Sequence, residues 1–409
     1  MSVVRRPSYS AGPFQTPAST ATEKTQVLHI LTTFNRSSGA ALNAQITLNA
    51  LPRDRFRVFL AVPWGESAEP VVAADVGRFY VPNLTRSIRP WDDLLAFWSI
   101  YRLCRLWRFD IVHTHNSKDG ILGRWAAHLA GVPAIVHTIH NLPFRASRVA
   151  LVNRLYAGLE RLTARITDRL LGVSSENIRE YLNRSIGKKT QYRVVYSGLE
   201  LDRYRLEVTQ AQARQSLSLS AERRIVGWFG RLNYQKDPVT FVRAARLIAD
   251  LDQNVQFVVC GDDPLGEDLG RRVLQLVDEL NLTDRVRFLG FRSDLPLIMR
   301  AVDCVMHSSR YEGMGRVVCE ALMCDRAVAG TNVDGVREVI ISGERGGFLV
   351  PPEDPRALAD ATLALLRDSA RAAKLAAAGR EWVTDNLSAT RMVHDITTVY
   401  DELTAAART

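Results

Sequence analysis

Residues 311–322 of the chain read YEGMGRVVCEAL, and they follow the apolar segment Asp303–Ser309. This order predicts a buried strand, a glycine-rich turn, and then a short apolar helix that carries a second carboxylate. The glycines let the backbone approach a ligand, while the first N–H groups of the helix and its dipole face a bound anion. Because two acids, Glu312 and Glu320, flank the turn, the ligand should have hydroxyl groups as well as phosphates. The stretch therefore predicts a site for a nucleotide or a nucleotide-sugar.

The bulk composition is that of a globular protein with more than one domain. At 409 residues the chain is too long for one ordinary core, so we expect two domains. No apolar run approaches the roughly 20 residues that a transmembrane helix needs. The five cysteines form no CxxC pair, which favours reduced core thiols over disulfides or zinc ligands. The net charge of +9 favours an anionic partner and leaves nucleic acid, anionic lipid and phosphorylated small molecules open.

Apolar, β-branched runs alternate with helical patterns along the chain. The runs are continuously apolar, which is typical of parallel strands covered by helices on both faces. The first series of predicted strands comprises Val27–Phe34, Phe56–Val62, Phe109–His115, Ala134–His140, Leu170–Ser174 and Arg193–Ser197. The second series comprises Ile225–Arg231, Val255–Gly261, Val286–Phe291, Asp303–Ser309, Ala327–Thr331 and Phe348–Val350. The array predicts an α/β fold of two successive doubly wound parallel-sheet domains.

The predicted domain boundaries follow from breaks in this array. Residues 1–25 are rich in Ser, Thr, Pro and Ala and lack the apolar core of a signal peptide, so we expect a disordered tail. The first domain is predicted over residues 26–198 and the second over residues 199–386. Residues 387–409 have a helical pattern, and we expect this C-terminal helix to pack back toward the first domain.

A cluster of basic candidate residues follows the first predicted strand of the second domain. Arg231 would point from the carboxyl end of this strand into the crevice between the domains, where open α/β sheets bind ligands. Lys236 begins the next helix, where its charge opposes the helix dipole unless an anion lies nearby. A planar guanidinium and a flexible ammonium together suit a diphosphate. We favour this function over the alternative that both residues are ordinary surface charges.

The two carboxylates of the opening stretch have different expected roles. Glu312 and Glu320 would not share a face of one continuous helix, so Glu312 should lie in the turn before the helix. Glu320 could accept hydrogen bonds from two ribose hydroxyls, while Glu312 could meet the sugar. Arg316 and Glu320, four residues apart, could instead form only an ion pair on the helix surface. That alternative explains neither Gly313 nor Gly315.

Histidines at the ends of two strands in the first domain are further candidates. His140 lies at the exit of its strand, on the crevice side, and is expected to face the phosphate clamp. A single histidine at a strand end is more often structural. His113 and His115 have the i, i+2 spacing of two metal ligands, but the sequence shows no third ligand, so we expect no metal.

The segment of residues 143–190 is strongly basic. Arginines gather between Arg145 and Arg169, and an apolar helical face is expected beside them. This face comprises Leu151, Leu155, Leu159, Leu162 and Ile166. The segment is either an ordinary amphipathic helix with a solvated basic face or a docking surface for an anionic membrane, and the sequence leaves both interpretations open.

In their order, these elements resemble the GT-B-fold retaining glycosyltransferases of glycosyltransferase family 4. The resemblance covers the chain from about Val27 to the C-terminus. Its motifs in the first half are Asp110-Ile111-Val112-His113-Thr114-His115, Gly120-Ile121-Leu122-Gly123-Arg124, His137-Thr138-Ile139-His140 and Gly172-Val173-Ser174. Its motifs in the second half are Gly230-Arg231 with Lys236, Gly261-Asp262, Glu312 with Glu320, Gly335-Val336-Arg337-Glu338 and Gly347-Phe348-Leu349-Val350-Pro351-Pro352. The chain departs from the family pattern at Ser38 and Asp334, where glycines are usual, and at Ser197, where asparagine is usual.

The resemblance implies two Rossmann-like domains that face each other across a cleft, an acceptor domain over residues 26–198 and a nucleotide-sugar donor domain over residues 199–386. It also implies that a sugar moves from a UDP- or GDP-sugar to an acceptor hydroxyl with retention at the anomeric carbon. The implied catalytic residues are His140, Glu312, Arg231 and Lys236. The implied donor site comprises Gly39, Gly230, Arg231, Lys236, Glu312, Gly313, Met314, Gly315, Arg316 and Glu320. No cofactor and no metal are expected, because the basic clamp can stabilise the leaving diphosphate as a divalent ion does elsewhere.

The same resemblance points to an acceptor glycan, expected to be lipid-linked, in the synthesis of a bacterial envelope or exopolysaccharide. It implies a cytoplasmic enzyme without a nucleic-acid partner, and the basic segment adds the hypothesis of a peripheral position on the cytoplasmic membrane. Three other classes of protein compete with this interpretation. A dehydrogenase is disfavoured because Val318 occupies the third glycine position of the dinucleotide motif. A nucleotide-sugar epimerase of the same fold and a non-catalytic nucleotide-sugar-binding partner subunit stay open.

Overall fold

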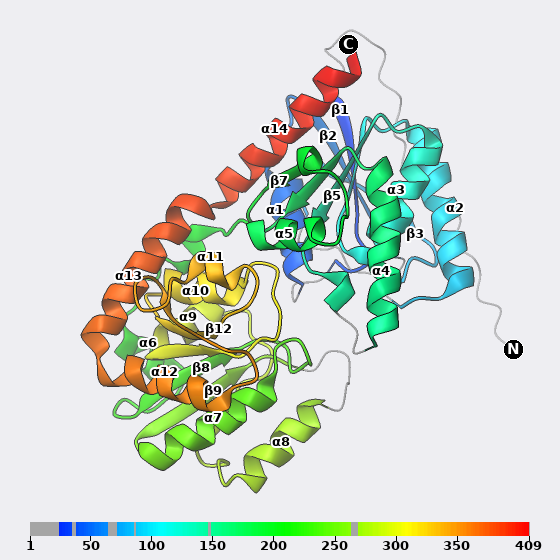
Figure 1. Ribbon diagram of the computed structural model, residues 1–409. Coiled ribbons are helices and arrows are strands. Elements are labelled where there is room, and N and C mark those ends of the chain that lie inside the picture. Colours follow the sequence, from blue (N-terminus) through cyan, green and yellow to red (C-terminus); the bar gives the residue numbers. More distant parts are fainter. Residues whose placement is uncertain are drawn as a thin grey trace, which may run out of the picture.

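The apolar runs of the sequence form two parallel sheets, and each sheet is covered by helices (Figure 1). The computed structural model describes residues 24–34, 38–63, 72–85, 87–145, 149–262 and 269–408. The two sheets belong to two α/β domains, so the predicted fold class is confirmed. Residues 1–23 of the expected tail lie outside the described part, as do residues 35–37.

The first domain contains a seven-stranded sheet in the order β3-β2-β1-β4-β5-β6-β7. Its strands are β1 (Thr25–Ile30), β2 (Phe56–Pro63), β3 (Gly77–Val81), β4 (Ile111–Thr114), β5 (Ala134–Ile139), β6 (Arg169–Gly172) and β7 (Tyr192–Val194). Its helices are α1 (Gly39–Ala50), α2 (Pro90–Trp107), α3 (Ser117–Ala130), α4 (Ala150–Thr163) and α5 (Ser175–Leu182). Because β1, β4 and β5 are neighbours, their carboxyl ends bring residues from distant parts of the sequence together at one edge.

The second domain contains a six-stranded sheet in the order β10-β9-β8-β11-β12-β13. Its strands are β8 (Arg224–Phe229), β9 (Val255–Cys260), β10 (Val286–Phe288), β11 (Cys304–His307), β12 (Val328–Thr331) and β13 (Gly347–Val350). Its helices are α6 (Gln210–Ser216), α7 (Pro238–Leu251), α8 (Leu269–Glu279), α9 (Leu295–Ala301), α10 (Arg316–Met323), α11 (Val336–Val339), α12 (Pro355–Arg367) and α13 (Ser369–Asn386). The strand order reverses at β8, so β8 and β11 form the switch point where such sheets bind ligands.

Two crossover segments connect the domains, and they are hydrogen-bonded to each other. Leu199 N donates to Leu387 O (2.7 Å), and Ala389 N donates to Leu199 O (2.9 Å). The chain then continues into α14 (Ala389–Arg408), the red helix that runs along the first domain in Figure 1. Residues of α14 join the core beneath the first sheet; they are Met392, Val393, Ile396, Val399, Tyr400 and Leu403. The end of the chain is thus part of the first domain's packing.

The strands differ from the predicted runs at one edge and at their carboxyl ends. Sequence analysis missed β3, which lies at the edge of the sheet and buries only Val81 fully. Most of the predicted strands were too long at their carboxyl ends; for example, β5 ends at Ile139, before His140, and β8 ends at Phe229, before Arg231. At these points the chain leaves the sheet, and the candidate site begins.

Candidate active site

Lys236 and Glu312 meet at the carboxyl ends of β8 and β11. Lys236 Nζ donates to Glu312 Oε1, and the pair is nearly enclosed, with side-chain exposures of 14% and 7%. The same oxygen accepts a hydrogen bond from Ser309 Oγ (2.7 Å) and lies 3.1 Å from His307 Nε2. Sequence analysis proposed Lys236 and Glu312 separately, and the structure brings them together. It also adds Ser309 and His307, which no motif had indicated.

The electrostatics of this cluster keep Glu312 ionised. Burial by itself would raise the pKa of Glu312, but the Lys236 ammonium and the contact with His307 outweigh burial and hold the pKa well below its usual value. An ionised carboxylate accepts hydrogen bonds and donates none. Glu312 can therefore bind hydroxyl groups or offset positive charge, but it cannot act as a general acid near neutral pH.

The loop that carries Lys236 is fastened to the segment after β11. Ser308 Oγ donates to the carbonyl oxygens of Lys236 and Asp237, both at 2.9 Å. Arg310 N donates to Gln235 O (2.8 Å), and the Arg310 guanidinium pairs with Asp237 at 3.0 Å. These contacts fix the direction in which the Lys236 side chain leaves its loop.

Gly230 and Arg231 directly follow β8, on the same edge as Lys236. Gly230 N donates to Cys260 O (3.0 Å), so the loop after β8 is paired with the end of β9. An ideal Cβ on Gly230 would lie 3.2 Å from Lys236 Cγ, which shows how closely the lysine stem passes the loop. Arg231 is half-buried in this loop. The basic residues proposed from the sequence therefore gather at one strand end.

The turn before α10 has the glycine geometry that an anion site needs. Gly315 is the N-cap of α10 and has a φ of 72°, in the left-handed region that favours glycine. Glu312 lies in the turn, and its backbone N–H donates to Asp334 Oδ2 at 2.8 Å. The side chain of Met314 packs in the core, so only the backbone of this residue can contact a ligand in the turn. Asp334, which stands where the family pattern usually has a glycine, thus holds the backbone of Glu312 in place.

Arg316 and Glu320 share one face of α10 and are tied to the crossover between the domains. Arg316 Nε lies 3.8 Å from Glu320 Oε1, and Arg316 Nη1 donates to Ser197 Oγ (3.1 Å) and Gly198 O (2.8 Å). Burial raises the pKa of Glu320, and the positive charge of Arg316 offsets part of this shift. The pair is therefore not a surface ion pair, because it is largely buried and links α10 to the crossover.

His140 lies directly against the turn of the other domain. An ideal Cβ on Gly313 would lie 2.0 Å from the His140 carbonyl oxygen, so a residue larger than glycine would force the domains apart. Gly39, the first residue of α1, also faces the second domain, since its ideal Cβ would lie 3.4 Å from Arg316 Cδ. Burial lowers the pKa of His140 to about 3, with a smaller contribution from the charge of Arg316. The His140 imidazole is therefore neutral at physiological pH.

A third histidine, which sequence analysis missed, lies beside His113 and His115. Nitrogen atoms of His29, His113 and His115 all lie within 4.8 Å of one another, because β1 and β4 are neighbours and pair His29 with His113. However, the rings of His29 and His113 stack on His115 at interplanar angles of 18° and 22°. The nitrogen atoms are joined by hydrogen bonds in a pattern described below.

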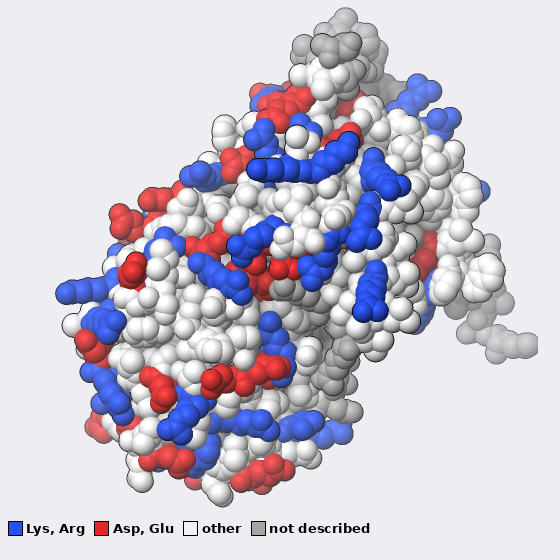
Figure 2. All heavy atoms as spheres, in the orientation of Figure 1, with Lys and Arg blue, Asp and Glu red and all other residues white. Residues whose placement is uncertain are grey.

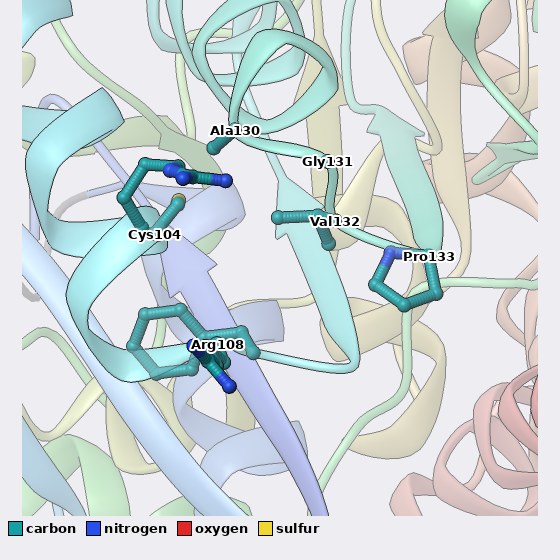
Figure 3. A pocket seen from close by; sticks show the side chains of 8 residues that line it. Cys104, Arg108, Ala130, Gly131, Val132 and Pro133 are labelled. Carbon is teal, nitrogen blue, oxygen red and sulfur yellow. The ribbon is translucent and has the colours of Figure 1, made fainter.

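A separate hollow lies at the opposite edge of the first sheet. It has a volume of about 280 Å³ and is lined by the C-terminal end of α2, including Cys104 and Arg108, and by Ala130–Pro133 (Figure 3). These residues precede β4 and β5, whereas His140 follows β5. The hollow therefore contains none of the residues proposed for the site.

Helix α4 exposes its apolar face and buries a charged residue, which is the reverse of an ordinary amphipathic helix. Its buried residues are Ala157, Glu160 and Thr163, and Glu160 pairs with the buried Arg124 at 2.8 Å. The leucines of its apolar face point outward, with Leu151 exposed by 72% and Leu155 by 63%. Lysine and arginine side chains gather over the same part of the first domain (Figure 2). The side chain of Arg145 lies outside the described part.

Two parallel-sheet α/β domains whose carboxyl edges meet have the arrangement of the GT-B fold. The first half of the chain, residues 38–203, matches the family model described as "Glycosyltransferase Family 4". Residues 209–382 match the model described as "Glycosyl transferases group 1". The chain belongs to glycosyltransferase family 4, and it is a retaining glycosyltransferase that uses a nucleotide-sugar donor.

Individual relatives support the same family. The chain is 31% identical over 307 residues to UDP-Gal:alpha-D-GlcNAc-diphosphoundecaprenol alpha-1,3-galactosyltransferase of Escherichia coli, a match that covers 74% of this chain and 78% of that protein. It is 33% identical over 323 residues to D-inositol 3-phosphate glycosyltransferase of Salinispora tropica, which covers 74% of this chain and 65% of that protein. The fold is similar to that of Alr3699/HepE of Anabaena in complex with UDP and glucose, with a TM-score of 0.79 and 21% identity over 92% of this chain and 99% of that chain.

Proposed function

We propose that this protein transfers a hexose from a UDP-sugar to a hydroxyl group of a lipid-diphosphate-linked glycan, in the synthesis of an envelope or exopolysaccharide. The observation that carries the proposal is the enclosed Lys236–Glu312 pair, which lies at the switch point of the second sheet. UDP as the donor nucleotide and a diphosphate-linked acceptor are supported by the name of the E. coli relative. The transfer retains the configuration at the anomeric carbon.

In this proposal Lys236 and Arg231 bind the donor diphosphate. An ammonium group has three N–H donors, so Lys236 can keep its bond to Glu312 while it donates to a phosphate oxygen. As the bond between sugar and phosphate breaks, negative charge grows on the diphosphate and is stabilised by the basic pair and by the N–H groups of the turn. Such stabilisation in a largely buried site is stronger than in water. The chain's own residues can thus do the electrostatic part of the reaction.

The carboxylates and the histidine orient the donor. Glu312, which is held ionised, accepts hydrogen bonds from hydroxyl groups of the sugar, and Glu320 accepts them from the ribose. His140, which is neutral, contacts the sugar from the first domain. The backbone of Gly39, Gly313 and Gly315 lines the diphosphate. Closure of the two domains over the donor excludes water from the reacting atoms.

The test is a transfer assay that follows a screen of UDP- and GDP-sugars by thermal shift. We expect one UDP-hexose to stabilise the protein and to be transferred to a lipid-diphosphate-linked acceptor, with an α-configured product detected by NMR. An epimerised donor without any acceptor would instead identify an epimerase. Binding of the nucleotide-sugar without transfer or slow hydrolysis would identify a non-catalytic partner subunit.

We further propose that α4 and the start of α2 dock on an anionic membrane surface. Helix α2 also carries exposed apolar side chains near its start, and they are Trp91, Leu94, Leu95 and Trp98. Burial raises the pKa of Tyr156 in α4, and the charge of Asp93 in α2 adds to this shift, so the start of α2 acts electrostatically on α4. Among the described helices, none is both long and apolar enough to cross a bilayer. An amphipathic surface of this kind binds at the level of the lipid headgroups.

A basic groove beside α4 supports an anionic acceptor on the same face. The groove has a volume of about 460 Å³, and Arg154, Arg161 and Arg184 line it together with Phe144. Phe144 is four residues from His140 in the sequence, so the groove lies on the acceptor domain near the proposed transfer site. Guanidinium groups in such a cluster suit a diphosphate.

Liposome sedimentation tests the membrane proposal. The variant Leu151→Ser/Leu155→Ser should lose most of its binding to vesicles that contain phosphatidylglycerol. Leu251→Ser/Leu274→Ser removes two exposed leucines from the second domain and should leave binding unchanged. Equal binding by both double variants would reject α4 as the docking surface.

A further inference from the structure

A chain of hydrogen-bonded side chains links His140 to the C-terminal helix α14. All of its members are buried, and they lie in β1, β4, β5 and α14 or, for His115 and His140, directly after β4 and β5. The successive contacts are Thr138 Oγ1 with His113 Nε2 (2.7 Å), His113 Nδ1 with Tyr400 Oη (2.6 Å), Tyr400 Oη with His29 Nε2 (3.2 Å), His29 Nδ1 with His115 Nε2 (2.9 Å), and His115 Nδ1 with His140 Nε2 (3.1 Å). The chain thus has five bonds and two ends, one at Thr138 and one at His140.

The four imidazoles in this chain are neutral. Burial lowers the pKa of His29 to about 3 and lowers the pKa values of His113 and His115 well below the usual value. His140 is neutral for the same reason. A neutral imidazole carries one N–H donor and one nitrogen lone pair. Each histidine can therefore donate to one neighbour only and must accept from the other.

If Tyr400 donates to one of its two histidines and accepts from the other, this rule allows two arrangements of the protons. An arrangement in which Tyr400 accepts from both would leave its own hydroxyl proton without an acceptor among the described residues. In the first, Thr138 donates to His113, and every later member donates to the next, so that His140 accepts at Nε2 and carries its proton on Nδ1. In the second, every bond is reversed, so that His140 donates from Nε2 and Thr138 accepts. The tautomer of His140 is thus fixed by the direction of the whole chain.

The hydroxyl group of Thr138 selects between the two arrangements. In the second arrangement its own proton would need another acceptor, and among the described residues His113 is its one hydrogen-bond partner. A buried donor without an acceptor costs about 1–3 kcal/mol, which is about a 5- to 160-fold preference against that arrangement. The first arrangement gives an acceptor to every donor from Thr138 to His115, and it leaves His140 with an N–H on Nδ1.

We propose that Tyr400 is a positioning residue for sugar transfer: it joins the two halves of this chain and thereby keeps His140 as a neutral Nδ1–H donor. The proposal rests on the proposed contact between His140 and the donor sugar, where the Nδ1–H would donate to an oxygen of the sugar. Tyr400 is the only member from α14, so the C-terminal helix completes the site as well as packing the first domain. Without its hydroxyl, the Thr138 end can no longer direct the His140 end.

The test reads the tautomer directly in Tyr400→Phe. The phenyl ring keeps the volume and the edge contact with Phe56, whose ring centroid is 5.8 Å away, so the packing is preserved. The ¹⁵N chemical shifts of the eight histidines distinguish Nδ1–H from Nε2–H, and His140→Gln assigns the His140 signal. We expect His140 in the wild-type protein to be the Nδ1–H tautomer and to become a mixture in Tyr400→Phe.

The rate of sugar transfer should fall when the tautomer of His140 changes. We expect kcat of Tyr400→Phe to fall about three- to tenfold, the effect of losing one neutral hydrogen bond, while KM for the donor changes less than about twofold. Tyr192→Phe is the matched control, because it removes another buried tyrosine hydroxyl, bonded to Ile186 O, from the same domain. The control should change neither the His140 tautomer nor kcat.

Two results would overturn the proposal, and they can be told apart. A wild-type His140 in the Nε2–H form, or one unaffected by Tyr400→Phe, would refute the directed chain whatever the activity. A changed tautomer with unchanged kcat would refute the role in transfer and would also remove His140 from the proposed sugar site. If Tyr400→Phe fails to fold, Thr138→Val removes the other determinant of direction and should give the same mixture; an unaltered His140 signal there would equally refute the chain.

Discussion

Lys236→Met is the sharpest single perturbation of the candidate site, because it removes an ammonium group and keeps the length of the side chain. Glu312 then stays buried with Ser309 and His307 as its remaining partners. Removing one partner of a buried ion pair typically costs about 3–5 kcal/mol. The carboxyl group can limit this cost by taking up a proton, so we expect a loss of about 3 kcal/mol in the free energy of unfolding at pH 8.

The loss should depend on pH in a defined direction. In the wild type the pKa of Glu312 is depressed, so the pair contributes stability above the usual pKa of 4.5 and loses it as the pH falls. In Lys236→Met burial remains and the ammonium is gone, so the pKa of Glu312 should be raised. In the variant, Glu312 therefore lowers the free energy of unfolding as the pH rises above about 4.5. The difference between variant and wild type should therefore already be present at pH 4.5, where the wild-type pair still contributes, and it should grow as the pH rises to 8.

Urea unfolding, followed by tryptophan fluorescence at several pH values, measures this difference. Glu312→Gln should cost less, about 1 kcal/mol, because the Lys236 ammonium can turn toward solvent. The double variant should cost about 2 kcal/mol less than the sum of the single ones. Transfer by Lys236→Met should fall about 10²- to 10³-fold in kcat, as expected for a lost group that stabilises the leaving charge. A pH-independent loss would refute the electrostatic reasoning, and full activity would refute the diphosphate clamp.

Three other residues give independent predictions. Asp119 is buried, and burial raises its pKa to about 7, so the stability of the wild-type protein falls between about pH 4 and 7. In urea unfolding, Asp119→Asn should be more stable than the wild type by up to about 4 kcal/mol at pH 8 and equally stable near pH 4. Gly313→Ala should push the domains apart at the His140 carbonyl, and small-angle scattering should show a larger radius of gyration with transfer reduced more than tenfold. Glu160→Gln leaves the Arg124 guanidinium buried without its anion and should cost about 3–5 kcal/mol in thermal or urea unfolding, whereas a loss under 1 kcal/mol would contradict the pairing.

The sequence predicted the two domains because buried parallel strands are continuously apolar, and that signal is local. It could not predict β3, since Gly77–Val81 forms an edge strand that is not continuously apolar and buries only Val81 fully. It found Lys236 and Glu312 from strand-end motifs but not their contact, which depends on the adjacency of β8 and β11. His29 was missed because it lies inside an apolar run, and only the pairing of β1 with β4 sets it beside His113. Local patterns reveal elements, whereas strand order decides which side chains meet.

Helix α4 illustrates a different limit. Its spacing predicts a leucine face correctly, but spacing does not say which face is buried. That choice is made by Arg124 in α3, which is fully enclosed and requires the Glu160 carboxylate beside it. A buried charge without a partner costs more than the exposure of a few leucines, so the pair turns Glu160 inward and the apolar face outward. The exposed leucines that we assign to a membrane are thus a consequence of one buried ion pair.

The site depends on how the two domains are held together as much as on its reactive groups. Arg316, in the first turn of α10, is bonded to Ser197 and Gly198 at the first crossover, and it lies against Gly39. That crossover is in turn bonded to the second one, which leads into α14 and Tyr400. A nucleotide bound at the start of α10 would therefore touch the element that holds the crossovers, while Tyr400 orients His140 from the other end of the same path. Donor binding and the arrangement of the first domain are connected through covalent neighbours and buried hydrogen bonds, without any contact between the donor and α14.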